Sequence, residues 1–317
     1  MEIQNKRDLI TIADLEAEEI HHLLRVAGRL KADLRAGRPH AWLAGKTLAM
    51  IFEKPSLRTR VTFETGMNQL GGKAIHLGPS DILLGRRESV ADIGTNLSLW
   101  VDIIMARTFL HQSVEDLAGS AQVPVINGLS DLYHPCQVLA DCFTLTELRQ
   151  NPSRELASLS VTFVGDGNNM VHSWLMAAAR LGFRFTLVCP EGYEPDMAVV
   201  EKARAMASSE LTVTHDLMEG TRNVDVLYTD VWASMGQEQE AETRKKVFAP
   251  YQLDQRVVNN AADDVIVMHC LPAHRGEEIT AEVIDGPHSC ILPQAENRLH
   301  MQKALIAWLL RAPHALI

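Results

Sequence analysis

Residues 48–60 read Leu-Ala-Met-Ile-Phe-Glu-Lys-Pro-Ser-Leu-Arg-Thr-Arg and predict a strand, a tight turn and a helix in succession. The apolar run 48–52 is typical of a buried strand. Beyond the turn, apolar residues recur at helical spacing until a pair of glycines ends the pattern. They are Leu57 and Val61 on one helical face, followed by Phe63, Met67 and Leu70.

The start of this helix is a candidate anion site. Ser56 stands at the N-cap position, so its hydroxyl, the free backbone N–H groups of the first turn, Arg58 and Thr59 converge. Backbone donors, the helix dipole and a guanidinium would together hold an oxyanion. An ordinary cap followed by solvated arginines is the alternative. The loop has no glycine and departs from the Walker pattern, which favours a small phosphorylated molecule over a nucleotide.

Composition limits the partners of the chain. A length of 317 residues favours two domains, and an apolar fraction of 46% is ordinary for a globular protein. The formal net charge of −10 and the lack of a basic cluster argue against nucleic acid. The five cysteines include no Cys-x-x-Cys pair, so we expect neither a disulfide framework nor a zinc site. No run has signal-peptide or membrane-spanning length, which predicts a cytoplasmic protein without membrane partners.

Strand and helix patterns alternate along the whole chain and predict two α/β domains. Each domain should hold a parallel sheet flanked by helices, with the active site in the interdomain cleft, outside the carboxyl ends of the strands. We expect domains at 1–150 and 151–295, separated near the Asn-Pro-Ser sequence of residues 151–153, and a C-terminal helical segment, 296–317, packing back on the first domain. The expected strands lie near 47–52, 73–77, 102–106 and 123–126, and then near 159–164, 185–188, 211–213, 224–228 and 265–268, with helices at 14–36 and 135–149.

Polar side chains follow the strands of the first domain. Arg107 comes directly after the apolar run 103–106, and His134 and Gln137 stand where the next helix begins, with Pro135 at its first position. A lone arginine or histidine is more often structural. Because the carboxyl ends of parallel strands share one edge, these side chains and the Ser56 loop could form a single site for an anion and a carbonyl group.

The second domain opens with a strand followed by Gly165-Asp-Gly-Asn-Asn169, which partly matches a dinucleotide-binding fingerprint. Met170 occupies the position of the third glycine, so a nicotinamide cofactor is disfavoured. Asn168 and Asn169 would instead project amide groups from the turn, or simply serve as turn residues.

Two later segments also end strands with reactive groups. Residues 230–238 combine Asp230, Ser234 and a glycine-containing turn, which suits the ammonium group of an amino acid, although an ordinary capped loop is the alternative. The run 265–268 ends in His269 and Cys270. A buried cysteine is usually inert, but one at a strand end near basic groups could have thiolate character.

Taken together, these segments resemble the aspartate/ornithine carbamoyltransferase family, and the resemblance covers nearly the whole chain. Ser-x-Arg-Thr-Arg marks the superfamily, whereas Ser234-Met-Gly236 and His269-Cys-Leu-Pro272 are similar to the ornithine branch. The matching segments, in order, are 52–60, 106–108, 134–137, 165–169, 230–238, 269–272 and 295–298.

The resemblance implies a reaction and a set of roles. The carbamoyl group of carbamoyl phosphate would pass to the side-chain amine of L-ornithine, giving citrulline and phosphate, as in arginine biosynthesis. The residues implied for carbamoyl phosphate are Ser56, Leu57, Arg58, Thr59, Arg107, His134, Gln137, Cys270, Leu271 and Arg298. Those implied for ornithine are Asn169, Asp230, Ser234 and Met235. The implied catalytic residues are Arg107, His134, Asp230 and Cys270, with no metal and no organic cofactor.

The resemblance also implies a homotrimer. Two positions depart from the family pattern: Leu57 replaces a common threonine, and Leu83 stands where relatives place a Gln or His that reaches a neighbouring subunit's site. Each change could weaken carbamoyl phosphate binding by ~1–3 kcal/mol, unless water compensates. The alternatives are another acceptor amine, such as N-acetylornithine, putrescine or aspartate, a non-catalytic binder of a phosphorylated ligand, and a nicotinamide dehydrogenase.

Overall fold

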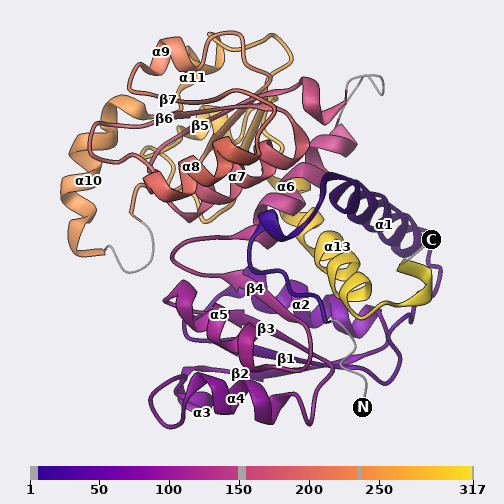
Figure 1. Cartoon of the computed structure of the whole chain (residues 1–317). Helices are drawn as coiled ribbons and strands as arrows, with labels where there is room; N and C mark the ends of the chain where they lie inside the picture. Colours follow the sequence, from indigo (N-terminus) through magenta and orange to yellow (C-terminus); the bar gives the residue numbers. More distant parts are fainter. Residues whose placement is uncertain (1–5, 149–154, 234–237, 316–317) are drawn as a thin grey trace. The chain divides into compact units, whose positions relative to one another are not determined.

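The chain folds into two compact units, Met1–Phe143 with Glu296–Ile317 and Thr144–Ala295. The computed structural model in Figure 1 describes residues 6–148, 155–233 and 238–315. Each unit holds one parallel sheet flanked by helices, with strand orders β2-β1-β3-β4 and β7-β6-β5-β8-β9. The predicted α/β class with two parallel sheets is confirmed.

The first unit is built on β1, whose neighbours β2 and β3 both pair with it in parallel. The run 48–52 does form a buried strand, and the helix predicted after it follows at Leu57. The strands are β1 Thr47–Phe52, β2 Lys73–Leu77, β3 Ile103–Arg107 and β4 Val125–Leu129. The helices of this part of the chain are η1 Ile12–Asp14, α1 Ala17–Arg35, α2 Leu57–Gln69, α3 Pro79–Ile82, α4 Val90–Leu97, α5 His111–Ser120 and α6 Pro135–Leu148.

Helix α2 has two apolar stripes, of which one is buried and the other is exposed. Phe63 and Met67 are fully buried, as their spacing predicts, whereas Leu57 and Val61 are exposed. On one face of the sheet, Ile51 and Ile104 pack with side chains of α4 and α5 in one hydrophobic cluster. The exposed stripe of α2 therefore remains available for contacts that the single chain does not make.

The end of β4 differs from the sequence expectation. The strand was expected near 123–126, but it continues through Asn127 and Gly128 to Leu129. Asn and Gly are typical turn residues, so local sequence favours a loop here. Tertiary pairing decides otherwise, because the Asn127 N–H donates to the Leu9 carbonyl at 2.8 Å and β3 pairs with β4 along this stretch.

The second unit repeats the strand and helix alternation around β5. Helices α7 and α8 pack side by side on the sheet, visible in salmon and red in Figure 1. Its strands are β5 Ser160–Val164, β6 Arg184–Val188, β7 Leu211–Thr214, β8 Val226–Thr229 and β9 Ile266–His269. Its helices are η2 Leu156–Ser158, α7 Asn169–Leu181, α8 Met197–Met206, α9 Leu217–Gly220, η3 Glu238–Glu240, α10 Ala241–Phe248, η4 Ala249–Tyr251, α11 Gln255–Val258 and α12 Ala281–Ile284.

Side-chain alternation along these strands gives the second sheet two different faces. Trp174 of α7 lies against the aromatic face, with its ring centroid 5.4 Å from that of Tyr228 and 6.2 Å from that of Phe185. Truncating this buried tryptophan would cost roughly 3–5 kcal/mol of stability. The aliphatic residues of the opposite face pack with α9, α11 and α12, and they are Val164, Val188, Leu227 and Val267.

The long C-terminal helix α13 covers Ile291–Leu309. It begins five residues before the expected start at Glu296. Pro293 lies in its first turn, where backbone N–H groups have no partner within the helix, so a proline is tolerated there. Polar contacts join it to the first unit: Lys31 Nζ lies 2.6 Å from Asn297 Oδ1, and Lys303 Nζ lies 2.9 Å from Gln69 Oε1. The buried polar residues of α13 are Gln294, Asn297, Arg298, His300, Gln302 and Lys303.

No helix in the described part of the chain is long and apolar enough to span a membrane.

Lys303 should make stability depend on pH. Its side chain is fully buried, and burial lowers the pKa of the amine from 10.5 to about 8. Between these values the unfolded chain holds a proton that the folded protein has released, so the free energy of unfolding rises with pH. The rise is about 3 kcal/mol at about 1.4 kcal/mol per pKa unit.

We expect Lys303→Met to lose most of this rise, whereas substitution of the exposed Lys73 by Met should keep it. Urea unfolding midpoints measured near pH 7.5 and near pH 9.5 test the expectation. Parallel pH dependence in the wild type and Lys303→Met would show that Lys303 is not the titrating group.

Candidate active site

The turn between β1 and α2 has the predicted cap geometry. Ser56 has extended backbone angles, and its Oγ accepts a hydrogen bond from the Thr59 N–H at 3.3 Å. Helix α2 begins at Leu57, so the free N–H groups of its first turn and the positive end of its dipole face the same end. The half-buried Arg58 adds a guanidinium to this helix start.

Two buried arginines converge on the hydroxyl of Thr59. Arg298 of α13 donates to Thr59 Oγ1 at 3.1 Å, and Arg107 at the end of β3 donates to the same oxygen at 3.4 Å. Arg298 also donates to Gln137 Oε1, and the amide nitrogen of Gln137 donates to Asp141 at 2.8 Å. Since two buried guanidinium groups repel one another, an anion with several oxygens would offset the charge and accept bidentate hydrogen bonds.

Arg107 is aimed by an irregularity in the sheet. The register between β3 and β4 shifts between Ala106 and Arg107, as at a β-bulge, which redirects the side chain at the strand end. Gly128 permits this approach, since a Cβ atom there would lie 2.5 Å from the sulfur of Met105. Glu53 holds the following turn, accepting from the Phe109 N–H at 2.8 Å. Neither Gly128 nor Glu53 stood out in the sequence.

His134 is held neutral by its surroundings. It precedes Pro135, the first residue of α6, as predicted, and a turn between Ser130 and Tyr133 precedes it, with the Ser130 N–H donating to the Tyr133 carbonyl at 2.9 Å. Burial, and then the positive charges of Arg298, Arg107 and Arg58, lower the pKa of His134 well below 6.5. A neutral imidazole offers one N–H to an oxygen without adding a further positive charge.

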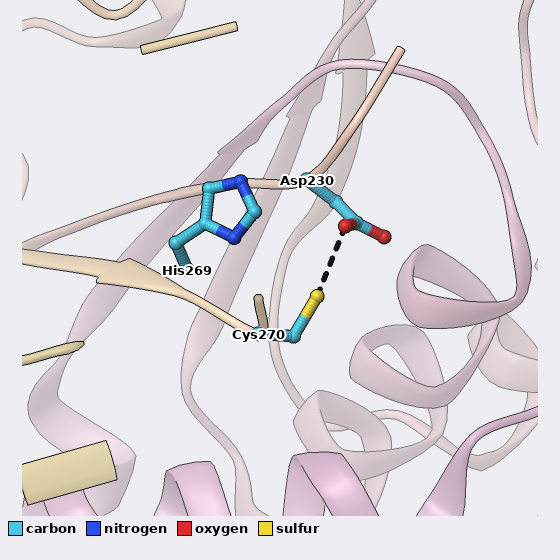
Figure 2. Close-up of side chains that lie close together, drawn as sticks. All are labelled: Asp230, His269 and Cys270. Carbon is cyan, nitrogen blue, oxygen red and sulfur yellow. Dashed lines mark hydrogen bonds between the residues drawn. The ribbon is translucent and has the colours of Figure 1, made fainter. Parts of the chain in front are cut away.

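The second unit brings Asp230 and Cys270 together, as Figure 2 shows. The Cys270 thiol donates to Asp230 Oδ1 at 3.0 Å, and the Val231 N–H donates to the same oxygen at 2.8 Å. The amide of Asn168 lies 3.5 Å from Asp230 Oδ2. A donated S–H means a neutral thiol, so this arrangement does not favour the thiolate alternative.

A buried His–Glu pair supports the strand end that carries Cys270. The Leu271 N–H donates to His269 Nδ1 at 2.9 Å, which leaves the other ring nitrogen to donate to Glu278 Oε1 at 3.1 Å. Leu271 has a φ of 61°, a left-handed conformation that is costly for a leucine and that often marks a functional site. The sequence marked His269 as the end of a strand and as part of a family motif, and Glu278 had no signal beyond its charge.

Arg244 of α10 binds the backbone at Trp232, two residues after Asp230. It donates to Asp166 Oδ2 at 2.8 Å and to the Trp232 carbonyl at 3.0 Å, and its guanidinium lies 5.0 Å from the ring centroid of Tyr193. Burial raises the pKa of Asp166, and the charge of Arg244 opposes that rise. The pair therefore orders the loop near Asp230, a role that sequence spacing did not reveal.

The predicted residues thus fall into two groups. Ser56, Thr59, Arg107, Gln137 and Arg298 form one connected hydrogen-bond network in the first unit. Their neighbours in that unit are Arg58 and His134, and the second unit joins Asp230 to Cys270.

Five predicted residues lie outside these two groups or outside the described residues. One is Leu271, whose N–H donates to His269 Nδ1. Leu57 is exposed and has only its backbone N–H to offer. Asn169 is half-buried and is the first residue of α7, directly after the cap Asn168. Ser234 and Met235 lie outside the described residues.

Comparison with known proteins identifies this combination of fold and site. Residues 7–147 match the family described as "Aspartate/ornithine carbamoyltransferase, carbamoyl-P binding domain", and residues 157–309 match its "Asp/Orn binding domain". Each α/β unit has a parallel sheet; one carries an arginine-rich helix start and the other an Asp–Cys pair. This combination is that of a carbamoyl-group transferase. The chain belongs to the aspartate/ornithine carbamoyltransferase family.

Individual relatives agree over nearly their full length. The ornithine carbamoyltransferase of Syntrophus aciditrophicus is 51% identical over 301 residues, which are 95% of this chain and 98% of that protein. The structure of ornithine carbamoyltransferase from Pyrococcus furiosus has a TM-score of 0.91 at 50% identity, covering 95% of this chain and 96% of that one. The anabolic enzyme from Campylobacter jejuni has a TM-score of 0.90 at 38% identity, covering 96% and 98%.

Two arginines of α2 provide a matched test of the anion site. Arg58 acts on His134 within the cluster, whereas Arg60 is exposed and lies 3.6 Å from Glu64. We expect Arg58→Ala to weaken phosphate binding roughly 10- to 100-fold, since a hydrogen bond to a charged group contributes about 1.5–3 kcal/mol.

Calorimetric titration with inorganic phosphate measures this effect, and Arg60→Ala is the control that should bind as the wild type does. Equal losses in the two variants would mean that the helix start attracts anions only through its general charge.

Proposed function

We propose that this protein transfers the carbamoyl group of carbamoyl phosphate to the side-chain amine of L-ornithine, giving L-citrulline and phosphate. The observation that carries the proposal is the convergence of Arg107 and Arg298 on Thr59 at the start of α2. A buried set of cations at a helix start suits the dianionic phosphate of the donor substrate. The names of relatives at about 50% identity, which include the anabolic enzyme of Pyrococcus furiosus, support the choice of acceptor.

The first unit would hold carbamoyl phosphate. Ser56, Arg58 and Thr59, with the Leu57 N–H, would bind the phosphate oxygens. Arg107 and His134 would donate to the carbonyl oxygen, whose charge grows as the carbon becomes tetrahedral, while Gln137 fixes the position of Arg298. One well-placed donor of this kind contributes roughly 3–4 kcal/mol to transition-state stabilisation. Because His134 is neutral, its donated proton is available across neutral pH.

The second unit would hold the amino acid. Asp230 would bind the α-ammonium, as a carboxylate held by Asn168, the Val231 N–H and Cys270. Asn169, Ser234 and Met235 complete this proposed set for ornithine. Cys270 and the Leu271 carbonyl would contact the carbamoyl group and the attacking amine, because both residues follow the β9 strand end.

The proposed chemistry needs a neutral amine. A side-chain amine with a pKa near 10.4 is mostly protonated at neutral pH, so one proton must leave before attack. The Asp230–Cys270 pair is the candidate for positioning that amine and receiving its proton. The nitrogen lone pair then forms the C–N bond and the carbonyl electrons move to oxygen. Their return breaks the C–O bond to release phosphate, and the proton that the attacking nitrogen still carries in excess passes to the leaving phosphate. All these roles use side chains, so the proposal includes neither a metal nor an organic cofactor.

We place the protein in the cytoplasm and in the biosynthetic direction. The five cysteines are all free, which suits a reducing compartment. Relatives named anabolic support biosynthesis, although phosphorolysis of citrulline would use the same residues.

An assay with a panel of amines tests the reaction. Purified protein given carbamoyl phosphate should yield a carbamoylated product from L-ornithine, and little from N-acetylornithine, putrescine or aspartate. We expect Asp230→Asn to lose most of this activity while it still binds phosphate, because the phosphate site lies in the other unit. Product from a different amine, or none from ornithine, would contradict the proposed acceptor.

We also propose a homotrimer, in line with the family resemblance. The surface of the first unit exposes large apolar side chains at Leu57, Val61, Ile75, Leu83, Leu99 and Trp100. These residues lie on or beside α2, β2, α3 and α4, and both α2 and α3 contact the edge strand β2. Large exposed apolar surfaces usually mark protein–protein interfaces, and we assign this one to further copies of the chain.

Light scattering after gel filtration should give three times the chain mass of 35.2 kDa. We expect Trp100→Glu to reduce this mass, because it places a charge in an apolar contact. Substituting Glu for the exposed Met197 of α8, outside this surface, should leave the mass unchanged. A wild-type protein with the mass of one chain would rule out the trimer.

A further inference from the structure

A second group of polar side chains follows β9, beyond the residues assigned to the reaction. His274, Glu277 and Glu278 each offer one ligand atom, and these atoms all lie within 4.8 Å of one another. His274 is half exposed, whereas Glu278 is fully buried. The three side chains therefore form a small polar site with one buried wall.

Glu278 supplies the observation that points to a ligand. Its Oε1 accepts from His269 Nε2 at 3.1 Å and from the His274 N–H at 2.6 Å. Within the described part of the chain, its Oε2 has no hydrogen-bond partner. The hydrogen bonds from His269 and His274 fix the orientation of the carboxylate and leave Oε2 directed away from both donors. A buried, charged oxygen without a donor is costly and requires a cation nearby.

Both carboxylates are held in the same way. Glu277 places Oε1 2.9 Å from the Lys245 amine, while its Oε2 lies 3.9 Å from His274 Nδ1. Glu278 Oε2 lies 3.8 Å from that same nitrogen. One oxygen of each carboxylate is thus fixed by a neighbour, and the other faces the imidazole. Outer contacts of this kind orient the ligands of metal sites.

We propose that His274 Nδ1, Glu277 Oε2 and Glu278 Oε2 bind a divalent transition-metal ion of the zinc class. Zinc accepts imidazole nitrogen and carboxylate oxygen at about 2.0–2.2 Å, which places tetrahedral ligands about 3.3 Å apart. Shifts of roughly half an ångström would bring both carboxylate oxygens from 3.8 and 3.9 Å to this distance from His274 Nδ1, and the three ligand atoms already lie within 4.8 Å of one another. A water molecule takes the fourth position. Hard ions such as Ca²⁺, which need six or more oxygen ligands, fit poorly.

The site connects to the proposed reaction through Glu278. Its other oxygen accepts from His269, whose second ring nitrogen accepts from the Leu271 N–H. A bound ion would therefore act on the strand end that carries Cys270. The sequence has no Cys-x-x-Cys pair, so the expectation of no zinc site did not extend to a triad of one histidine and two carboxylates.

The experiment must separate this site from a second group, Asp230, His269 and Cys270, whose ligand atoms also lie within 4.8 Å of one another. Metal-free, full-length Cys270→Ser protein removes the thiol, and calorimetric titration with ZnCl₂ then counts the remaining sites. Co²⁺ in place of zinc gives an absorption spectrum that shows whether sulfur is a ligand.

In the Cys270→Ser background we expect one zinc per chain and a Co²⁺ spectrum without a thiolate band. Adding His274→Ala or Glu277→Gln should weaken binding at least about tenfold. The matched control is His215→Ala, which removes an exposed histidine that lies 3.5 Å from Glu194 without a third ligand and should bind zinc unchanged. Absence of zinc binding in the Cys270→Ser protein, or equal affinity after His274→Ala, would overturn the proposal. In either case the imidazole of His274 would itself be the partner of the two carboxylates.

Discussion

Two buried guanidinium groups bound to one hydroxyl oxygen are the constraint around which the first unit is organised. Arg107 and Arg298 reach Thr59 from positions 48 and 239 residues away in the sequence. Like charges in a buried position repel, so this arrangement is most stable when an anion shares the site. A ligand that binds only the folded chain adds its binding free energy to stability, so an anion bound here would help to hold α2, β3 and α13 together.

The neighbouring groups follow from the same charge. His134 stays neutral because burial and the surrounding arginines disfavour its proton, and it can therefore donate to an oxygen as a neutral group. The bulge at Arg107 and the close approach at Gly128 place the side chain, not only the backbone, at the strand end. Electrostatic preorganisation of this kind needs donors that are fixed before the substrate arrives.

The second unit holds a carboxylate, that of Asp230, in a fixed position. Asp230 is held by a thiol, a backbone N–H and an amide, and Arg244 fastens the following loop through Asp166 and Trp232. The His269–Glu278 pair fixes the left-handed Leu271 beside it. Arg107, Asp230 and Cys270 therefore stand at or directly after strand ends, whereas Arg244 and Glu278 contact them only through other residues.

The sequence alone predicted much of this, because the relevant signals are local. Apolar periodicity located every strand of both sheets, and the predicted Ser56 cap and Pro135 helix start were correct. Most residues of the candidate site were predicted from their positions at strand ends. Local signals gave the wrong boundary where a pairing partner was distant in the sequence: Asn127 and Gly128 resemble a turn but continue β4. A proline also misled the prediction of α13, which begins five residues early because its first turn tolerates Pro293.

What the sequence by itself determined is the order of elements and the chemistry at their ends, since these depend on neighbours within a few residues. Only the tertiary structure decided which groups act together. The contacts of Arg298 with Thr59, of Arg244 with Asp166 and of His269 with Glu278 join separate elements. Burial then sets their charge states, because desolvation and nearby charges depend on the whole fold and leave no mark on local sequence.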